Sequence, residues 1–185
     1  EKKILEKGIK LKTKSDTEIL LNCYKIWNLG CLNMLEGMFA FSIYDKKNNI
    51  VILARDKSGQ KPLYLSKNDT SLSFSSELKG LLQNSNIKRK LSKESFIQYL
   101  HQGYVSGRKS LLQDVFKLKA GLYLIYNLSK GDVTFKNFFH LPLNPDLNNT
   151  SKDSNNLFKK FGNLLGSSVK DQIYADVPVG ILLSG

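Results

Sequence analysis

Residues 37–82 contain four short apolar segments, arranged as two pairs around a polar corner. Residues 39–44 alternate large apolar with small or polar side chains, which is typical of a strand whose two faces meet different environments. Residues 50–54 (IVILA) form a continuous apolar run, as expected of a buried strand that returns from a polar turn. Residues 63–65 and 71–74 repeat this arrangement. The pattern predicts a sheet-rich core.

The corner between the two predicted hairpins, residues 54–62 (ARDKSGQKP), is too polar and too rich in turn residues to be a strand. Charged side chains between four apolar strands lose favourable hydration unless those charges are paired. We therefore interpret Arg55 and Asp56 as a buried ion pair that gives this corner a fixed shape.

Length and composition describe a globular chain. Its 185 residues are 41% hydrophobic and can bury one good core, or one core and part of another. No apolar run approaches the roughly 18 residues of a membrane span, and no basic-then-apolar leader opens the chain. The two cysteines lack metal-ligand spacing and suit a reducing compartment. We therefore expect a cytoplasmic protein with no membrane partner and no metal site.

The formal net charge of +12, from 28 Lys+Arg against 16 Asp+Glu, has two interpretations. One is attraction to nucleic acid or another acidic surface, which would make the chain a non-catalytic basic binding module. The other is the use of lysine as a general solubilising residue. The lysines are scattered, and the short cluster at residues 88–90 has no interleaved aromatic side chains for stacking on bases. The second interpretation is favoured, so no nucleic-acid partner is expected.

A helix is predicted to begin at Ser15, ahead of the sheet-forming stretch. Ser15 and Glu18 match a capping box, and such a cap contributes about 1 kcal/mol to helix stability. Apolar residues then recur at helical spacing as far as Trp27. Physical chemistry alone makes Asp16 an acid in the first helical turn, where the helix dipole favours negative charge. The same carboxylate, held rigidly at a helix start, is also able to receive an ammonium group.

A later helix is predicted over residues 91–100, opened by Ser92, with Phe96, Ile97 and Leu100 as its buried stripe. A strand pair follows it and completes the first region, with a turn and a strand within 117–126 and the returning strand at 133–139.

The chain divides at a proline- and asparagine-rich segment, residues 141–153, whose composition marks a linker. Residues 1–140 are therefore predicted to form a first domain, and residues 154–185 the start of a second. The second begins with a long amphipathic helix, which starts at residue 153 or 154, and continues into an apolar strand that ends at Ser184-Gly185. A helix followed by such a strand is the entry to a parallel α/β sheet.

Four motifs follow one another along the chain: GMFAF at 37–41, ARD at 54–56 with Gly59, KPLY at 61–64 and SELK at 76–79. In this order and spacing they resemble the glutaminase domain of glutamine-hydrolysing asparagine synthetases, a class II glutamine amidotransferase on the N-terminal-nucleophile fold. SDTE at 15–18 and DVPVG at 176–180 extend the resemblance over nearly the whole chain. The resemblance implies an α+β domain with truncated αββα layers, followed by the start of an α/β nucleotide-binding domain.

The resemblance also assigns site residues. It implies that Asp16 binds the α-amino group of glutamine and that Met38 lines a tunnel for ammonia, although Met38 as ordinary core filler stays an alternative. It implies that Leu182, Leu183, Ser184 and Gly185 begin a loop that binds the pyrophosphate of ATP, and the alternative here is an ordinary buried strand ending in a turn.

The nucleophile of the resembling family is a cysteine at the mature N-terminus, whose own α-amino group serves as the base. This chain begins with Glu1. We therefore expect no catalytic residue within it and no glutamine hydrolysis by the fragment alone. Cys23 lies on the apolar face of the predicted helix, and Cys31 has no histidine near it in sequence, so neither is interpreted as a nucleophile.

For the whole protein the resemblance implies an ATP-dependent carbon–nitrogen ligase. Ammonia released from glutamine would attack an aspartate that ATP, with Mg²⁺, has adenylated, and the products would be asparagine, AMP and pyrophosphate. The implied partners are glutamine, aspartate and ATP. Whether the protein forms a homodimer is left open at this stage. A relative that acts on another carboxylate or closes a ring remains an alternative, as does the basic binding module.

Overall fold

The computed structural model describes residues 1–141, 154–173, 175 and 177–183. It contains two units, Glu1–His140 and Leu141–Gly185, which are described separately below. In chain order, the elements of the first unit are α1 (Lys2–Leu5), α2 (Asp16–Trp27), the 3-10 helix η1 (Asn28–Met34), β1 (Ala40–Asp45), β2 (Ile50–Arg55), β3 (Tyr64–Lys67), β4 (Leu72–Ser75), α3 (Leu78–Leu81), α4 (Lys93–Gln102), β5 (Phe116–Lys117), β6 (Leu122–Asn127) and β7 (Val133–Asn137).

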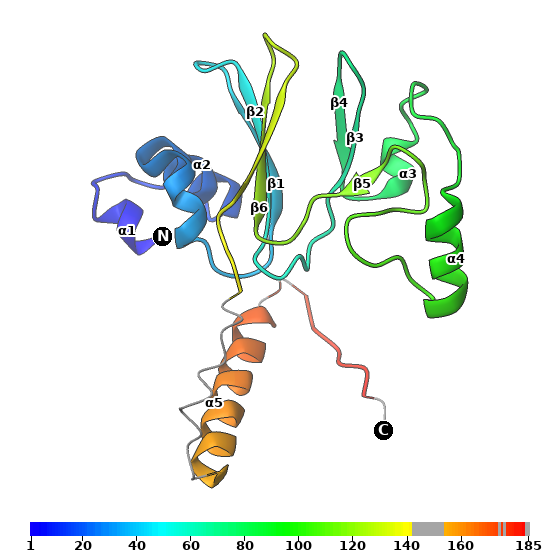
Figure 1. Ribbon diagram of the computed structural model, residues 1–185. Helices are drawn as coiled ribbons and strands as arrows, with labels where there is room; N and C mark the ends of the chain where they lie inside the picture. The colour runs from blue at the N-terminus through cyan, green and yellow to red at the C-terminus, as the bar shows by residue number, and fades with distance from the viewer. Residues whose placement is uncertain (142–153, 174, 176, 184–185) are drawn as a thin grey trace. The chain divides into compact units, whose positions relative to one another are not determined.

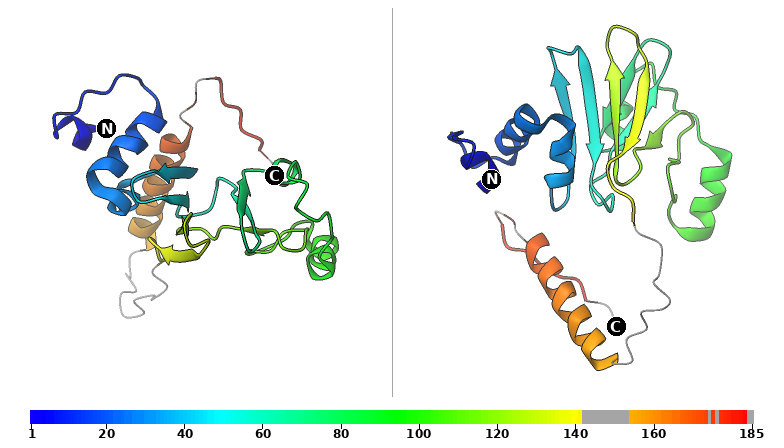
Figure 2. Two further views of the ribbon diagram at one scale, coloured as in Figure 1. Left: turned by 90° about the horizontal axis from the view of Figure 1, so that it is seen from above. Right: turned by 60° about the vertical axis from the view of Figure 1, so that its left-hand side comes forward.

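Two antiparallel sheets form the centre of the first unit. One has the strand order β1-β2-β6-β7 and the other has the order β4-β3-β5. Helices α1 and α2 lie beside the four-stranded sheet, the three-stranded sheet lies on its other side, and α3 and α4 lie beyond that (Figure 1; seen from above in Figure 2, left). The predicted α+β class is confirmed, and the layers follow the order helix, sheet, sheet, helix.

Strand alternation supplies two separate cores. Leu53 and Leu124 of the larger sheet pack with Leu65 of the smaller one. Ala54, the next residue after Leu53, packs instead with Cys23 of α2. Because successive side chains of a strand point to opposite faces, β2 contributes to both cores. Burying one leucine side chain such as Leu53 contributes about 2 kcal/mol to stability.

Helix α2 begins as predicted, with Ser15 as its N-cap. The Ser15 Oγ accepts a hydrogen bond from the Thr17 N–H at 3.2 Å. Glu18 differs from a capping box, because its carboxylate accepts hydrogen bonds from the N–H groups of Lys12 at 2.8 Å and Thr13 at 2.6 Å. Glu18 therefore fixes the loop before the helix rather than the cap residue itself, and both groups position the start of α2.

Helix α4 directs its polar side to the domain and its apolar side to solvent. Ser95 is 1% exposed, whereas Phe96, Ile97 and Leu100 are 43%, 56% and 67% exposed. The prediction that these three residues form a buried stripe is therefore wrong. Helical spacing identifies an apolar face, but it does not say which way that face turns.

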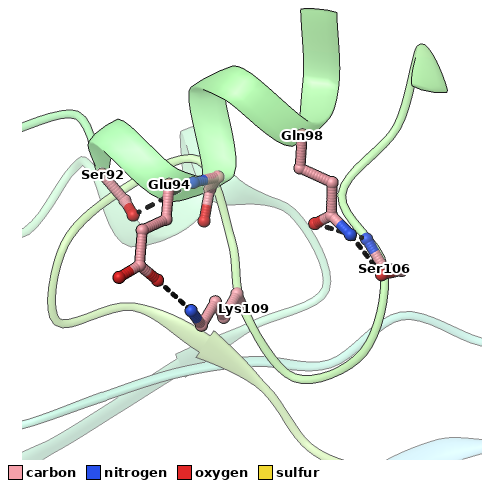
Figure 3. Close-up of polar contacts among 6 residues, drawn as sticks. Ser92, Glu94, Gln98, Ser106 and Lys109 are labelled. Carbon is pink, nitrogen blue, oxygen red and sulfur yellow. Dashed lines mark hydrogen bonds and ion pairs between the residues drawn. The ribbon is translucent and has the colours of Figure 1, made fainter. Parts of the chain in front are cut away.

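Polar side chains of α4 contact the loop that follows the helix. Glu94 forms an ion pair with Lys109, and the Gln98 Nε2 donates a hydrogen bond to the Ser106 Oγ at 2.5 Å (Figure 3). The Gln98 Oε1 also accepts a hydrogen bond from the Ser106 N–H at 3.2 Å. These contacts lie at the surface and join α4 to the loop that carries Ser106 and Lys109.

In the second unit, α5 (Ser154–Gln172) forms where the long amphipathic helix was predicted. Residues 177–183 are neither helix nor strand, so the strand predicted there is not formed in the described residues. A strand needs a neighbour to accept its backbone hydrogen bonds, and the described strands pair only within the two sheets of the first unit. Most of the predicted linker, residues 142–153, lies outside the described residues.

Candidate functional site

Asp16 and Met38, which are 22 positions apart in sequence, line the same pocket of about 580 Å³ in the first unit. Its walls come from the start of α2, the segment that leads into β1 and the polar corner after β2. The other lining residues are Thr17, Ile19, Leu20, Leu35, Glu36, Phe39, Ala40, Phe41, Lys61, Pro62 and Ser76. The pocket thus combines an apolar surface with two carboxylates and one ammonium group.

Asp16 is the first residue of α2 and is exposed at the pocket. Among the described residues, no ion pair involves its carboxylate. The backbone that carries it is fixed on both sides by the Ser15 cap and by the bonds of Glu18 to the preceding loop. A rigidly placed carboxylate without a counter-ion can accept hydrogen bonds from a ligand ammonium group.

Met38 is 40% exposed and stands at the pocket wall. This exposure argues against the alternative that Met38 is ordinary filler of a buried core. Phe39 and Phe41 line the same pocket, so this side of it is apolar. The rings of Phe39 and Phe41 lie 5.5 Å apart between centroids, within the range in which aromatic pairs stabilise one another.

The corner after β2 frames the pocket through Asp56, which is fully buried. One of its carboxylate oxygens accepts hydrogen bonds from the N–H groups of Ser58 at 3.1 Å and Gln60 at 3.0 Å. The other accepts from the N–H groups of Lys61 at 3.0 Å and Phe39 at 3.3 Å. Burial raises the pKa of Asp56, and these hydrogen bonds lower it. The hydrogen bonds together have the larger effect, so the pKa of Asp56 lies below its ordinary value.

Arg55 uses all three guanidinium nitrogens on backbone carbonyls. Its Nε donates to Lys61 O at 2.7 Å, its Nη1 to Leu118 O at 2.7 Å and its Nη2 to Gly59 O at 2.5 Å. Arg55 and Asp56 form no ion pair within the described residues, so that prediction is wrong. The corner does have a fixed shape, as expected. Its backbone N–H groups bind the Asp56 carboxylate, and its backbone carbonyls bind the Arg55 guanidinium.

The structure adds residues to the site that sequence reasoning did not assign. Lys61, Glu36 and Ser76 line the pocket, although no role was predicted for them. Lys61 and Ser76 belong to the KPLY and SELK motifs, so the motifs were the available signal. Glu36 directly precedes the GMFAF motif and carried no signal of its own.

The two cysteines are not placed as nucleophiles. Cys31 is 1% exposed and Cys23 is 6% exposed, and both pack in the core between α2, η1 and the larger sheet. Burial raises the pKa of Cys31 to about 11, and burial also raises the pKa of Cys23. A thiol with a raised pKa is mostly protonated near neutral pH and is a poor nucleophile.

The residues predicted for ATP are not assembled into a site in the described part of the chain. Leu182 and Leu183 are exposed and lie in the irregular segment of the second unit, and Ser184 and Gly185 lie outside the described residues. The described residues also contain no group of three or more His, Cys, Asp or Glu side chains that could hold a metal ion. Nor is any described helix both long and apolar enough to cross a membrane.

Comparison with known proteins shows the family of the first unit. Residues 1–139 match a family model described as the glutamine amidotransferase domain, and the chain belongs to this family. It is 33% identical over 180 residues to the putative asparagine synthetase [glutamine-hydrolyzing] 2 of Methanocaldococcus jannaschii, covering 96% of this chain and 34% of that protein. It is 34% identical over 179 residues to asparagine synthetase [glutamine-hydrolyzing] 1 of Bacillus subtilis, covering 97% of this chain and 27% of that protein. The predicted resemblance is confirmed.

The chain spans about a third or less of the length of these relatives. A solved structure, the glutamine phosphoribosylpyrophosphate amidotransferase from B. subtilis complexed with ADP and GMP, aligns with a TM-score of 0.49 at 20% identity. That alignment covers 76% of this chain and 26% of the other.

Proposed function

We propose that the pocket lined by Asp16 and Met38 is the glutamine site of an amidotransferase domain. The observation that carries this proposal is the position of Asp16, a carboxylate without a counter-ion at the pocket, in a chain of the glutamine amidotransferase family. In this proposal Asp16 accepts hydrogen bonds from the α-ammonium group of glutamine. Hydrogen bonds between ionised groups are among the strongest in proteins, which makes Asp16 a determinant of substrate affinity.

Met38 and the two phenylalanines beside it give the released nitrogen an apolar surface. An apolar wall disfavours ammonium, because a charged group there loses its hydration. It accommodates neutral ammonia, which is the form able to attack an activated carboxyl group. We therefore assign Met38 to the passage by which ammonia leaves the glutamine site.

For the full-length protein we propose glutamine-dependent asparagine synthesis in the cytoplasm. Ammonia from the first domain attacks an aspartate activated by ATP, which gives asparagine, AMP and pyrophosphate. The names of the relatives support this acceptor. The first domain comprises residues 1–140, residues 141–153 form a linker, and residues 154–185 open the ATP-dependent domain. Within the last of these, Leu182 to Gly185 begin the loop that binds the pyrophosphate of ATP, and Mg²⁺ accompanies ATP as a cofactor of the full-length protein.

The acceptor is tested by following the transferred nitrogen in the full-length protein. The protein is incubated with amide-¹⁵N glutamine, aspartate, ATP and Mg²⁺. The products are then separated and identified by mass spectrometry. The proposal predicts ¹⁵N-asparagine together with equal amounts of AMP and pyrophosphate. Glutamate formation without any ¹⁵N-asparagine, or ¹⁵N transfer only to a different carboxylate, would contradict asparagine synthesis.

A further inference from the structure

A second pocket, of about 450 Å³, lies between the first turn of α4 and residues 108–116. It shares no lining residue with the pocket of Asp16. Its volume is within the range of sites that hold small ligands, roughly 300–1,000 Å³. Three features of its lining indicate the kind of ligand.

The first feature is an unpaired buried hydroxyl. Ser95 is 1% exposed, lines this pocket, and has no hydrogen-bond partner for its Oγ among the described residues. The other serines of the pocket are satisfied: the Ser92 Oγ accepts from the Ser95 N–H at 3.3 Å, and the Ser110 Oγ donates to Leu112 O at 3.2 Å. A buried hydroxyl without a partner is unfavourable, so Ser95 favours a polar ligand in this pocket.

The second feature is a cation held in place without a counter-ion. The Arg108 guanidinium lies 5.2 Å from the ring centroids of both Phe116 and Phe135. No described carboxylate lies within ion-pair distance of it, whereas the neighbouring Lys109 is paired with Glu94 (Figure 3). The planar guanidinium group suits a carboxylate, which it can bind through two parallel hydrogen bonds. The N-terminus of α4, a helix of 10 residues, adds partial positive charge at the same pocket.

The third feature is an unpaired carboxylate in the same pocket. Asp114 lines it and takes part in no ion pair among the described residues. A phosphate would be repelled by this carboxylate, while a ligand that carries both charges would satisfy Arg108 and Asp114 together. Charge complementarity therefore favours a zwitterion over a simple anion.

We propose that this pocket binds a free α-amino acid. The α-carboxylate binds Arg108 and the first turn of α4, the α-ammonium group binds Asp114, and a polar group of the ligand reaches the Ser95 Oγ. The proposal is independent of the glutamine site, because it uses none of the residues of the first pocket.

The binding test is a titration of the ¹⁵N-labelled chain, residues 1–185, followed by NMR. L-asparagine, L-glutamine and L-aspartate are added separately, and inorganic phosphate serves as the comparison. At least one amino acid should give saturable shifts in the amides of residues 92–95 and 108–114, and these shifts should persist in Asp16→Asn. Absence of such shifts with all three amino acids, or equal shifts with phosphate, would overturn the proposal.

Three variants test the assigned contacts. Arg108→Gln and Asp114→Asn should each weaken binding at least about tenfold, measured with the amino acid that binds in the titration. Ser95→Ala should weaken binding by a smaller factor. Asn is suited to position 114, where φ is +59°, because it tolerates the left-handed region. Ser85→Ala, an exposed serine outside the pocket, is the matched control and should leave binding unchanged. Loss of binding in Arg108→Gln with none in Asp114→Asn would mean a simple anion site and would refute the amino-acid assignment.

Discussion

Arg55 and Asp56 are adjacent in sequence, and their charged groups bind the backbone of the same corner rather than each other. Lys61 links them: its N–H donates to the Asp56 carboxylate at 3.0 Å, and its carbonyl accepts from the Arg55 Nε at 2.7 Å. Lys61 also lines the pocket of Asp16. The two charges therefore define the shape of one pocket wall, and three predictions follow from the interactions around this corner.

Asp56→Asn should destabilise the first unit by about 3 kcal/mol or more. Each carboxylate oxygen of Asp56 accepts at least two N–H groups, and Asn would place an NH₂ group against one of these pairs of donors. The free energy of unfolding in urea measures the effect. Asp69→Asn, an exposed aspartate, is the matched control and should change stability by less than about 0.5 kcal/mol. Equal stability of the two variants would show that the corner is not held by Asp56.

The same residue predicts how stability depends on pH. The pKa of Asp56 is lower in the folded chain than its ordinary value, so the unfolded chain takes up the proton first as the pH falls. Stability from this group is present above the ordinary aspartate pKa of about 3.9 and is lost as the pH falls through the lower folded pKa. Glu18 and Asp45 also have lowered pKa values and act in the same direction.

Urea unfolding between about pH 5 and pH 2.5 therefore tests Asp56 by comparison with its variant. The natural chain should lose stability more steeply than Asp56→Asn over this interval, because the variant lacks one of the protons taken up on unfolding. Parallel profiles would mean that Asp56 does not have a lowered pKa.

Gly121 lies against the same corner, because its N–H donates to Asp56 O at 2.9 Å. Its φ is +68°, and an added Cβ would lie 2.9 Å from Phe139 O. Gly121→Ala should therefore lose about 2 kcal/mol or more, from the positive φ together with the steric clash. Gly107→Ala is the matched control, since φ there is +67° but nothing lies within 4 Å. If both variants unfold at the same urea concentration, the clash at Gly121 is not significant.

The strands could be predicted from sequence because their signals are local. The apolar run at 50–54 became β2 (Ile50–Arg55), and the turn and strand predicted within 117–126 include β6 (Leu122–Asn127). Alternation and polar turns determine these boundaries without knowledge of the rest of the chain.

The orientation of α4 and the pairing of the corner could not be predicted, because both depend on residues distant in sequence. Ser95 turns inward and Leu100 outward, although the helical spacing of the apolar residues does not say which face meets the domain. Arg55 bonds to Leu118 O, which is 63 positions away and carried no signal in the sequence. The pocket likewise needed the fold, since only the tertiary structure brings Lys61 to Asp16 and Met38.

Both cysteines should react slowly with thiol reagents in the folded chain. Burial raises the pKa of Cys31 to about 11, which lowers its thiolate fraction at pH 8 by roughly two orders of magnitude relative to an ordinary thiol. Ellman's reagent at pH 8 should therefore react slowly with the native chain and rapidly after unfolding in urea. Rapid reaction of one thiol in the native chain would show that Cys23 or Cys31 is more accessible than the structure indicates.

The central claim, that Asp16 binds the ammonium group of glutamine, is tested most directly by comparing two nitrogen sources in the full-length protein. Asp16→Asn should lower kcat/KM for glutamine by about 10- to 100-fold, as expected for loss of a hydrogen bond to a charged group. It should leave asparagine synthesis from added ammonia unchanged, and the exposed control Asp132→Asn should change neither rate. An unchanged kcat/KM for glutamine in Asp16→Asn, or an equal loss with both nitrogen sources, would contradict the account.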